Sequence, residues 1–147
     1  MTVGPILVAS DFSQQAQVAT DWAIDLAARL GVRVVVVHVF DLPILGLADA
    51  PMLVDATTAA RLTDDARAAL DGELIRVRGR GVEVEGVLRQ GDVRQLVPQL
   101  AASEGAGLVV VGSHGRQGLA RALLGSVAES IVRTSSVPVT VVRMQPR

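Results

Sequence analysis

The chain has 147 residues and a formal net charge of −1, and it contains neither cysteine nor lysine. This length fits a single domain, residues 1–147, with a substantial hydrophobic core. The near-neutral charge argues against a nucleic-acid-binding protein. The absence of cysteine excludes disulfides and cysteine metal sites. The absence of lysine excludes a P-loop and Schiff-base catalysis.

The sequence carries no visible signal for a membrane or for export. Residues 1–13 contain no basic region followed by a long apolar segment. No uncharged apolar run reaches the roughly 20 residues that a membrane helix needs. We therefore expect a soluble protein with no membrane partner, most simply cytoplasmic.

Two apolar runs near the start predict buried strands with a helix between them. The first strand is Ile6–Ala9, and the second, Val32–Phe40, is the clearest buried strand in the chain. Between them, apolar residues recur at helical spacing. Ser13 is suited to cap this helix at its N-terminus, and Gly31 is suited to end it.

The segment Asp41–Asp55 contains two prolines and a glycine among apolar residues. It is long for a connection in a compact domain, so it is either a lid or mobile binding loop, or a plain disordered loop. A helical pattern then returns over Thr57–Arg80 and ends at Gly81. The next strand, Val82–Arg89, alternates apolar and polar residues as an edge strand does.

The last third of the chain repeats the alternation of helix and strand. Asp92 caps a predicted helix that ends near Glu104, and Pro98 within it predicts a kink or a shorter helix. Leu108–Val111 is a fourth strand, buried on both faces, and Val137–Val142 is a fifth. The order β-α-β-α-β-α-β-α-β predicts an α/β fold with a doubly wound, five-stranded parallel sheet, in Rossmann-like order 3-2-1-4-5 with helices on both faces.

Between the fourth and fifth strands, Gly112, Gly115, Gly125 and Ser126 are spaced as G-x2-G-x9-G-S. We expect Gly112 to let the chain leave the strand in a strained conformation. Gly115 and Gly125 remove side chains where backbone N–H groups approach a ligand. Ser126 begins a helix, caps it and offers a hydroxyl to a phosphate. The alternative is a set of ordinary loop glycines with an ordinary cap.

Topology brings an acidic residue to this glycine loop. In the predicted order the first and fourth strands are neighbours, and their carboxyl ends carry Asp11 and Gly112. Ligands of such sheets bind in the crevice at that point. We therefore expect Asp11 to contact a ligand, although it could simply cap the first helix.

The basic residues of the loop are the candidates to neutralise phosphates. Arg116 is the better candidate, and Arg121 is more consistent with a solvated face. His114 lacks a neighbouring histidine, cysteine or carboxylate in a catalytic arrangement, so we predict no catalytic residue. His38, within a buried strand, is interpreted as a core residue with a satisfied hydrogen bond.

The segments VASDFS, VVVVHV and GSHGRQGLARALLGSVAESIVRTSSVPVTVVR resemble the universal stress protein family, over essentially the whole chain and within its ATP-binding branch. The resemblance implies that Asp11 and the backbone at Ala9 contact the adenosine and that the backbone of Val39 contacts the adenine. Ala9 stands where some members carry proline or glycine. The residues implied to line the ribose and phosphates are Gly112, Gly115, Gly125, Ser126 and Val127, and the predicted nucleotide-binding set also includes Ser113, His114 and Arg116.

The resemblance further implies a homodimer formed through the last strand, Val139 to Arg143. We expect an ATP-binding regulatory module, with an unidentified protein partner. Asp11 and Ser126 are the candidates to share Mg²⁺ with the phosphates, and no carboxylate cluster fixes a metal independently. The alternatives are a slow adenine-nucleotide hydrolase and a dimerising adaptor that binds no nucleotide. A dinucleotide-binding site is rejected because ASDFSQQ, after the first strand, contains no glycine.

Overall fold

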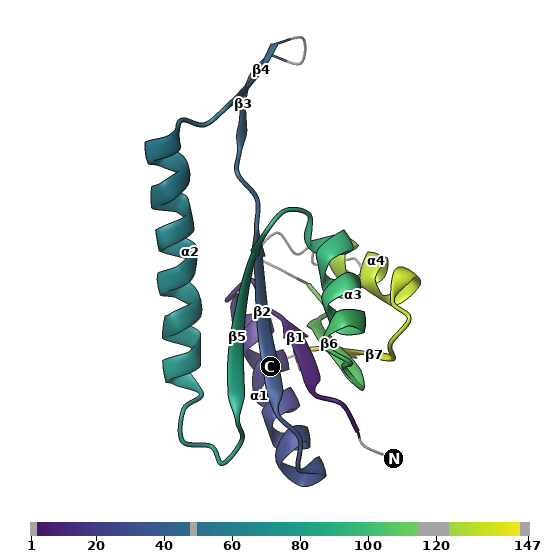
Figure 1. Cartoon of the computed structure of the whole chain (residues 1–147). Coiled ribbons are helices and arrows are strands. Elements are labelled where there is room, and N and C mark those ends of the chain that lie inside the picture. The colour runs from purple at the N-terminus through teal and green to yellow at the C-terminus, as the bar shows by residue number, and fades with distance from the viewer. Residues whose placement is uncertain (1–2, 48–49, 115–123, 145–147) are drawn as a thin grey trace.

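The computed structural model describes residues 3–47, 50–114 and 124–144, and it contains one five-stranded parallel sheet. The strands lie side by side in the order β5-β2-β1-β6-β7 (Figure 1). Numbered among themselves along the chain, these five strands have the predicted order 3-2-1-4-5, which is confirmed. Their bounds are β1 Ile6–Ala9, β2 Val34–Phe40, β5 Val84–Gln90, β6 Leu108–Gly112 and β7 Val139–Val142.

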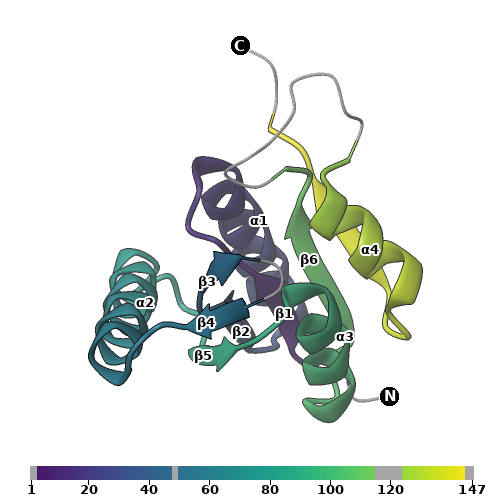
Figure 2. The same ribbon diagram turned by 90° about the horizontal axis from the view of Figure 1, so that it is seen from above.

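Helices cover both faces of the sheet, as predicted. Because side chains alternate along a strand, Ile6 and Val8 of β1 pack on one face and Leu7 packs on the other. Helices α1 (Gln14–Leu30) and α2 (Ala56–Arg76) pack on the first face. Helices α3 (Val93–Ser103) and α4 (Ser126–Thr134) pack on the second face, where Figure 2 shows them side by side.

The N-caps of α1 and α3 are the predicted ones, but the cap of α4 is not. Ser13 Oγ accepts a hydrogen bond from Ala16 N at 3.2 Å, and Asp92 Oδ1 accepts one from Arg94 N at 3.0 Å. At α4 the capping position is occupied by Gly125, which has no side chain to form such a bond. The prediction that Ser126 caps this helix is wrong, because Ser126 is already its first helical residue.

The predicted ends of the helix before β5 are also corrected. Helix α2 ends at Arg76 rather than at Arg80 because Val77, buried in the core, takes the C-cap position. Gly79 and Gly81 then adopt left-handed conformations, with φ of 81° and 78°. The edge position predicted for the strand that follows is confirmed, since β2 is the only strand in the described part of the chain that pairs with β5.

The segment Asp41–Asp55 forms a hairpin, so its interpretation as a plain disordered loop is wrong. Strands β3 (Ile44–Leu47) and β4 (Ala50–Leu53) pair antiparallel, and Figure 1 shows them projecting beyond the main sheet. A two-stranded ribbon leaves both outer edges unpaired, and a proline such as Pro51 is tolerated there. Whether the hairpin acts as a lid stays a prediction.

The N-cap of α2 follows directly after this hairpin. Asp55 Oδ1 accepts a hydrogen bond from Thr58 N, and this bond lowers the pKa of Asp55 below its usual 3.8. The ionised cap contributes its full stability above pH 3.8, the usual pKa of the group. This contribution is lost as the pH falls below 3.8 and through the lower pKa of the folded state.

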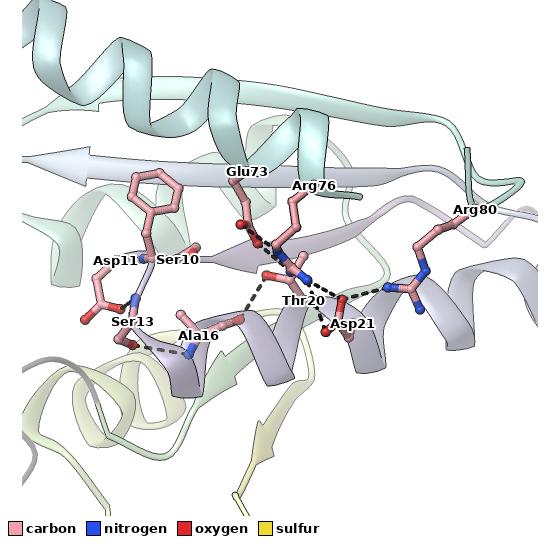
Figure 3. A network of polar contacts seen from close by, with 10 residues as sticks. Ser10, Asp11, Ser13, Ala16, Thr20, Asp21, Glu73, Arg76 and Arg80 are labelled. Atoms are coloured by element: carbon pink, nitrogen blue, oxygen red, sulfur yellow. Dashed lines mark hydrogen bonds and ion pairs between the residues drawn. The ribbon is translucent and has the colours of Figure 1, made fainter. Parts of the chain in front are cut away.

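Ion pairs fasten the end of α2 to α1 (Figure 3). Arg76 donates to both carboxylate oxygens of Glu73, which is buried, and to Asp21 of α1 at 3.0 Å. Arg80 pairs with Asp21 at 2.6 Å and with Asp25 at 2.8 Å. The hydrogen bond that Arg76 donates to Glu73 is the main cause that raises the pKa of Arg76. The guanidinium of Arg76 therefore neutralises an acid that would otherwise be buried alone.

We predict that Arg76→Ala destabilises the fold. It leaves the carboxylate of Glu73 buried without its cation, and we expect a loss of about 1–3 kcal/mol, below the value for a fully buried pair because Arg76 is partly exposed. Urea denaturation measures the change. The matched control is Arg133→Ala, which removes an exposed pair with Glu129 and is expected to cost less than about 0.5 kcal/mol. Equal losses in the two variants would contradict the prediction.

We also predict opposite outcomes for two serines at helix starts. Ser13→Ala removes a capping hydrogen bond and is expected to cost about 1 kcal/mol. Ser126→Ala removes no capping hydrogen bond and is expected to change stability by less than about 0.5 kcal/mol. Thermal unfolding without ligand measures both. A cost for Ser126→Ala as large as that for Ser13→Ala would restore Ser126 as the cap.

Candidate functional site

The carboxyl ends of three adjacent strands carry several of the predicted site residues. Strand β1 is hydrogen-bonded to β2 on one side and to β6 on the other. Ala9 ends β1, Val39 lies near the end of β2, and Gly112 ends β6. The structure therefore brings these positions together along the edge formed by the carboxyl ends of the strands, where ligands of doubly wound folds bind.

The turn from β1 into α1 positions Asp11 at this edge (Figure 3). Asp11 Oδ1 accepts a hydrogen bond from Ser13 N at 3.0 Å, and the buried Ser10 Oγ accepts one from Phe12 N at 3.1 Å. Between them Phe12 has a φ of 62°, a left-handed conformation that is uncommon for a bulky residue. Such strain often occurs at functional sites, where surrounding contacts enforce it.

An aromatic pair beside this turn was not found by sequence reasoning. The ring of Phe12 lies 4.4 Å from that of His38, measured between centroids. His38 Nδ1 lies 2.8 Å from the carbonyl oxygen of Ser10, to which it donates. The interpretation of His38 as a hydrogen-bonded residue is confirmed, although its side chain is only half-buried. No sequence pattern marks the pair, because it depends on the pairing of β1 with β2.

Two backbone hydrogen bonds hold the ends of the glycine loop. Ser113 N donates to Val142 O at 3.0 Å, and Gly125 N donates to Ser113 O at 2.6 Å. Ser113 is buried, and its hydroxyl lies 3.2 Å from Nδ1 of His114. The start of α4 is thereby fixed directly beside the end of β6. Gly115, Arg116 and Arg121, which the sequence also pointed to, lie outside the described residues.

Gly112 does not have the strained conformation that the sequence suggested. Its φ is not positive, and a Cβ placed on it would lie 3.4 Å from the carbonyl oxygen of Gln15, an ordinary contact. Gln15, in the first turn of α1, has a buried side-chain oxygen with no hydrogen-bond partner among the residues that the structure describes. Sequence reasoning missed Gln15, since nothing in its pattern distinguishes it from the neighbouring Gln14.

The N-terminus of α4 offers several hydrogen-bond donors. The N–H groups of Ser126, Val127 and Ala128 have no acceptor within the described chain, and the first-turn bond of this helix runs from Glu129 N to Gly125 O. Arg94, from α3, donates through Nη2 to Ser126 Oγ at 3.2 Å. Free N–H groups, the positive end of a helix dipole and a guanidinium together fit an anionic group such as a phosphate.

Among residues 3–47, 50–114 and 124–144, no group of three or more His, Cys, Asp or Glu side chains could hold a metal ion. A hollow of about 250 Å³, lined by Ala28, Arg33 and Glu83 among others, lies at the amino ends of the strands, away from this site. No helix in the described part of the chain is long and apolar enough to span a membrane.

Comparison with known proteins supports the resemblance read from the sequence. The family model described as the universal stress protein family matches residues 2–143. Universal stress protein Rv2005c of Mycobacterium tuberculosis is 35% identical over 145 residues. That match covers 95% of this chain but only 45% of the relative, so the chain spans about half the length of this curated relative.

Two solved structures resemble this one along almost their full length. A universal stress protein from Archaeoglobus fulgidus, solved in complex with dAMP, is 26% identical, with a TM-score of 0.68 and coverage of 96% of this chain and 98% of its own. A universal stress protein solved in complex with cAMP is 23% identical, with a TM-score of 0.68 and coverage of 97% and 98%. By its sequence and by its fold, the chain belongs to the universal stress protein family.

Proposed function

We propose that this protein is a regulatory module that binds an adenine nucleotide, with ATP as its ligand. The observation that carries the proposal is the open N-terminus of α4, whose free N–H groups stand next to Arg94 and beside the end of β6. It lies at the same edge of the sheet as Asp11. The family relatives solved with cAMP and dAMP add support, because both of those ligands contain an adenine and a phosphate.

Each part of the nucleotide has proposed partners along this edge. The adenosine contacts Asp11 and the backbone of Ala9, and the adenine meets the backbone of Val39. Mg²⁺, where it accompanies the phosphates, is shared with Asp11 and Ser126. The ribose and phosphates are surrounded by Gly112, Ser113, His114, Gly115, Arg116, Gly125, Ser126 and Val127.

Regulation rather than rapid catalysis fits the side chains at this edge. Within the described residues, no cluster of acidic side chains could activate a metal-bound water. The Asp11 carboxylate already accepts a hydrogen bond from Ser13 N. Positioned bases and metal ions are what accelerate phosphoryl transfer. We therefore expect hydrolysis of bound ATP to be slow.

We predict that ATP raises the melting temperature of the wild-type protein and that Asp11→Ala greatly reduces this rise. Loss of the Asp11 contact is expected to weaken ATP binding at least about tenfold, the typical effect of removing one hydrogen bond that involves a charged group. Calorimetric titration measures the affinity. Asp71→Ala, which removes an exposed aspartate from α2, is the matched control and should bind ATP normally.

Mass spectrometry of small molecules released from freshly purified, denatured protein separates the three functional hypotheses. Recovered ATP, or uptake of added ATP without turnover, supports the regulatory module. ADP or AMP that accumulates with time supports the hydrolase. No nucleotide, and no uptake from added ATP, supports the adaptor and would overturn the proposal.

We also propose that the protein forms a homodimer through β7. This strand lies at the edge of the sheet, and its four residues are each only half-buried. The carbonyl group of Pro138 accepts a hydrogen bond from Val109 of β6, and that of Val142 accepts one from Ser113, directly after β6. By alternation, the backbone of Val139 and Val141 therefore faces away from the sheet. An unpaired apolar edge of this kind is a template for pairing with a second strand.

We predict that Val141→Pro converts the dimer to a monomer. Proline removes an outward N–H group without removing a hydrogen bond to β6. Sedimentation velocity at a fixed concentration measures the oligomeric state, and Val141→Ala, which keeps the N–H group, is the control. A dimer that persists in the proline variant would place the interface elsewhere.

A further inference from the structure

Arg94 is the basic residue that the structure adds to the candidate nucleotide site. It is the second residue of α3, and its side chain is exposed. Its guanidinium crosses from α3 to α4 and donates to Ser126 Oγ at 3.2 Å. Ser126 is the hydroxyl residue of the G-x2-G-x9-G-S pattern. A cation far away in the sequence therefore stands against a residue implied to contact phosphate.

The location of Arg94 is electrostatically unfavourable unless an anion is present. Cations stabilise helix C-termini and destabilise N-termini, because the N-terminus carries the positive end of the helix dipole. Arg94 lies in the first turn of α3 and touches the first residue of α4, so it faces the positive ends of two helices. A bound polyanion would be attracted to Arg94 and to both helix N-termini, and this attraction would offset the repulsion between them.

The guanidinium of Arg94 forms no ion pair with a carboxylate in the described part of the chain. Arginines 33, 76, 80 and 133 each form an ion pair with an acidic side chain, whereas no carboxylate in the described part of the chain lies within ion-pair distance of the Arg94 guanidinium. The nearest acid in sequence, Asp92, uses its carboxylate to accept the backbone N–H of Arg94 as the cap of α3. The guanidinium keeps donors available for a ligand.

The chemistry of arginine defines the class of group that it would bind. The guanidinium presents donors in a planar fork that matches two oxygens of a phosphate. The N–H groups at the start of α4 can hold one phosphate without Arg94. An additional cation beside them matters most for a ligand with further phosphates, which carries more negative charge than a monophosphate or a cyclic nucleotide.

We infer that Arg94 contacts the distal phosphates of the bound nucleotide and makes the site selective for a nucleoside polyphosphate over a cyclic nucleotide or a monophosphate. The inference rests on the proposed function, since it assigns a specificity role within the same site. It concerns a residue on α3 that lies outside the glycine pattern.

The test compares ATP, AMP and cAMP binding to the wild type and to Arg94→Gln by calorimetric titration. We expect Arg94→Gln to weaken ATP binding at least about tenfold, as for loss of a charge-assisted hydrogen bond, and to weaken cAMP binding less than about threefold. Arg94→Lys should recover part of the ATP affinity, because it keeps the charge without the fork. The ATP affinity of Arg94→Gln should also depend less on salt.

Arg78→Gln is the matched control. Arg78 is exposed and lies in the turn after α2, at the amino ends of the strands and so at the other end of the sheet from the proposed site. Its removal should therefore leave all three affinities unchanged. Thermal unfolding without ligand verifies that each variant is folded. Because Arg94 is exposed, the unliganded stability of Arg94→Gln should equal or slightly exceed that of the wild type.

Three results would overturn the inference, and they are distinguishable. An equal loss of ATP and cAMP affinity in Arg94→Gln would mean that the residue supports the site without selecting for polyphosphates. Unchanged ATP affinity would mean that Arg94 does not touch the nucleotide, while the proposed function stands. A wild-type protein that binds none of the three nucleotides would remove the proposed function and this inference together.

Discussion

The position of β1 between β2 and β6 is the constraint on which the rest of the molecule depends. Residues Ile6, Leu7 and Val8 are paired on both sides and are almost fully buried on both faces. Alternation along this strand directs Leu7 toward α3 and α4 and its two neighbours toward α1 and α2. The same pairing places the ends of β1, β2 and β6 at one edge. The candidate site is thus a direct consequence of how the core is built.

At the carboxyl ends of these strands, the chain departs in three places from what its residue types usually prefer in backbone conformation, helix capping and charge. Phe12 adopts a left-handed conformation, α4 begins without a side-chain cap, and Arg94 faces two helix N-termini. Each feature costs stability when considered alone. Proteins generally accept such costs where a function requires them. A phosphate at the start of α4 would satisfy the free N–H groups and the guanidinium together, so one ligand accounts for two of the three exceptions.

The sheet order, both helix layers and the caps Ser13 and Asp92 could be predicted because they depend on short-range patterns: apolar periodicity, glycine and capping residues. Arg94 could not, because its contact with Ser126 requires α3 and α4 to be packed first. The cap of α4 was misassigned because Gly125 and Ser126 are both acceptable at that position, and only the backbone conformation separates them. The hairpin was missed because Pro51 argues against an interior strand but not against a ribbon of two strands.

The same architecture determines which part of α2 is held firmly and which part is not. Toward its end, α2 is held by Leu70 and Val77 in the core and by the ion pairs of Arg76 and Arg80 with α1. Its first ten residues, 56–65, include no buried side chain, and they project with the β3–β4 hairpin beyond the sheet (Figure 1). The hairpin leaves the sheet from β2, next to the proposed adenine contact at Val39. A ligand shifts a conformational equilibrium only through contacts that differ between the two states. Residues 56–65 contribute no buried side chain, so a change at the end of β2 caused by the proposed nucleotide would displace this part of α2 more easily than its end, which the ion pairs with α1 hold in place.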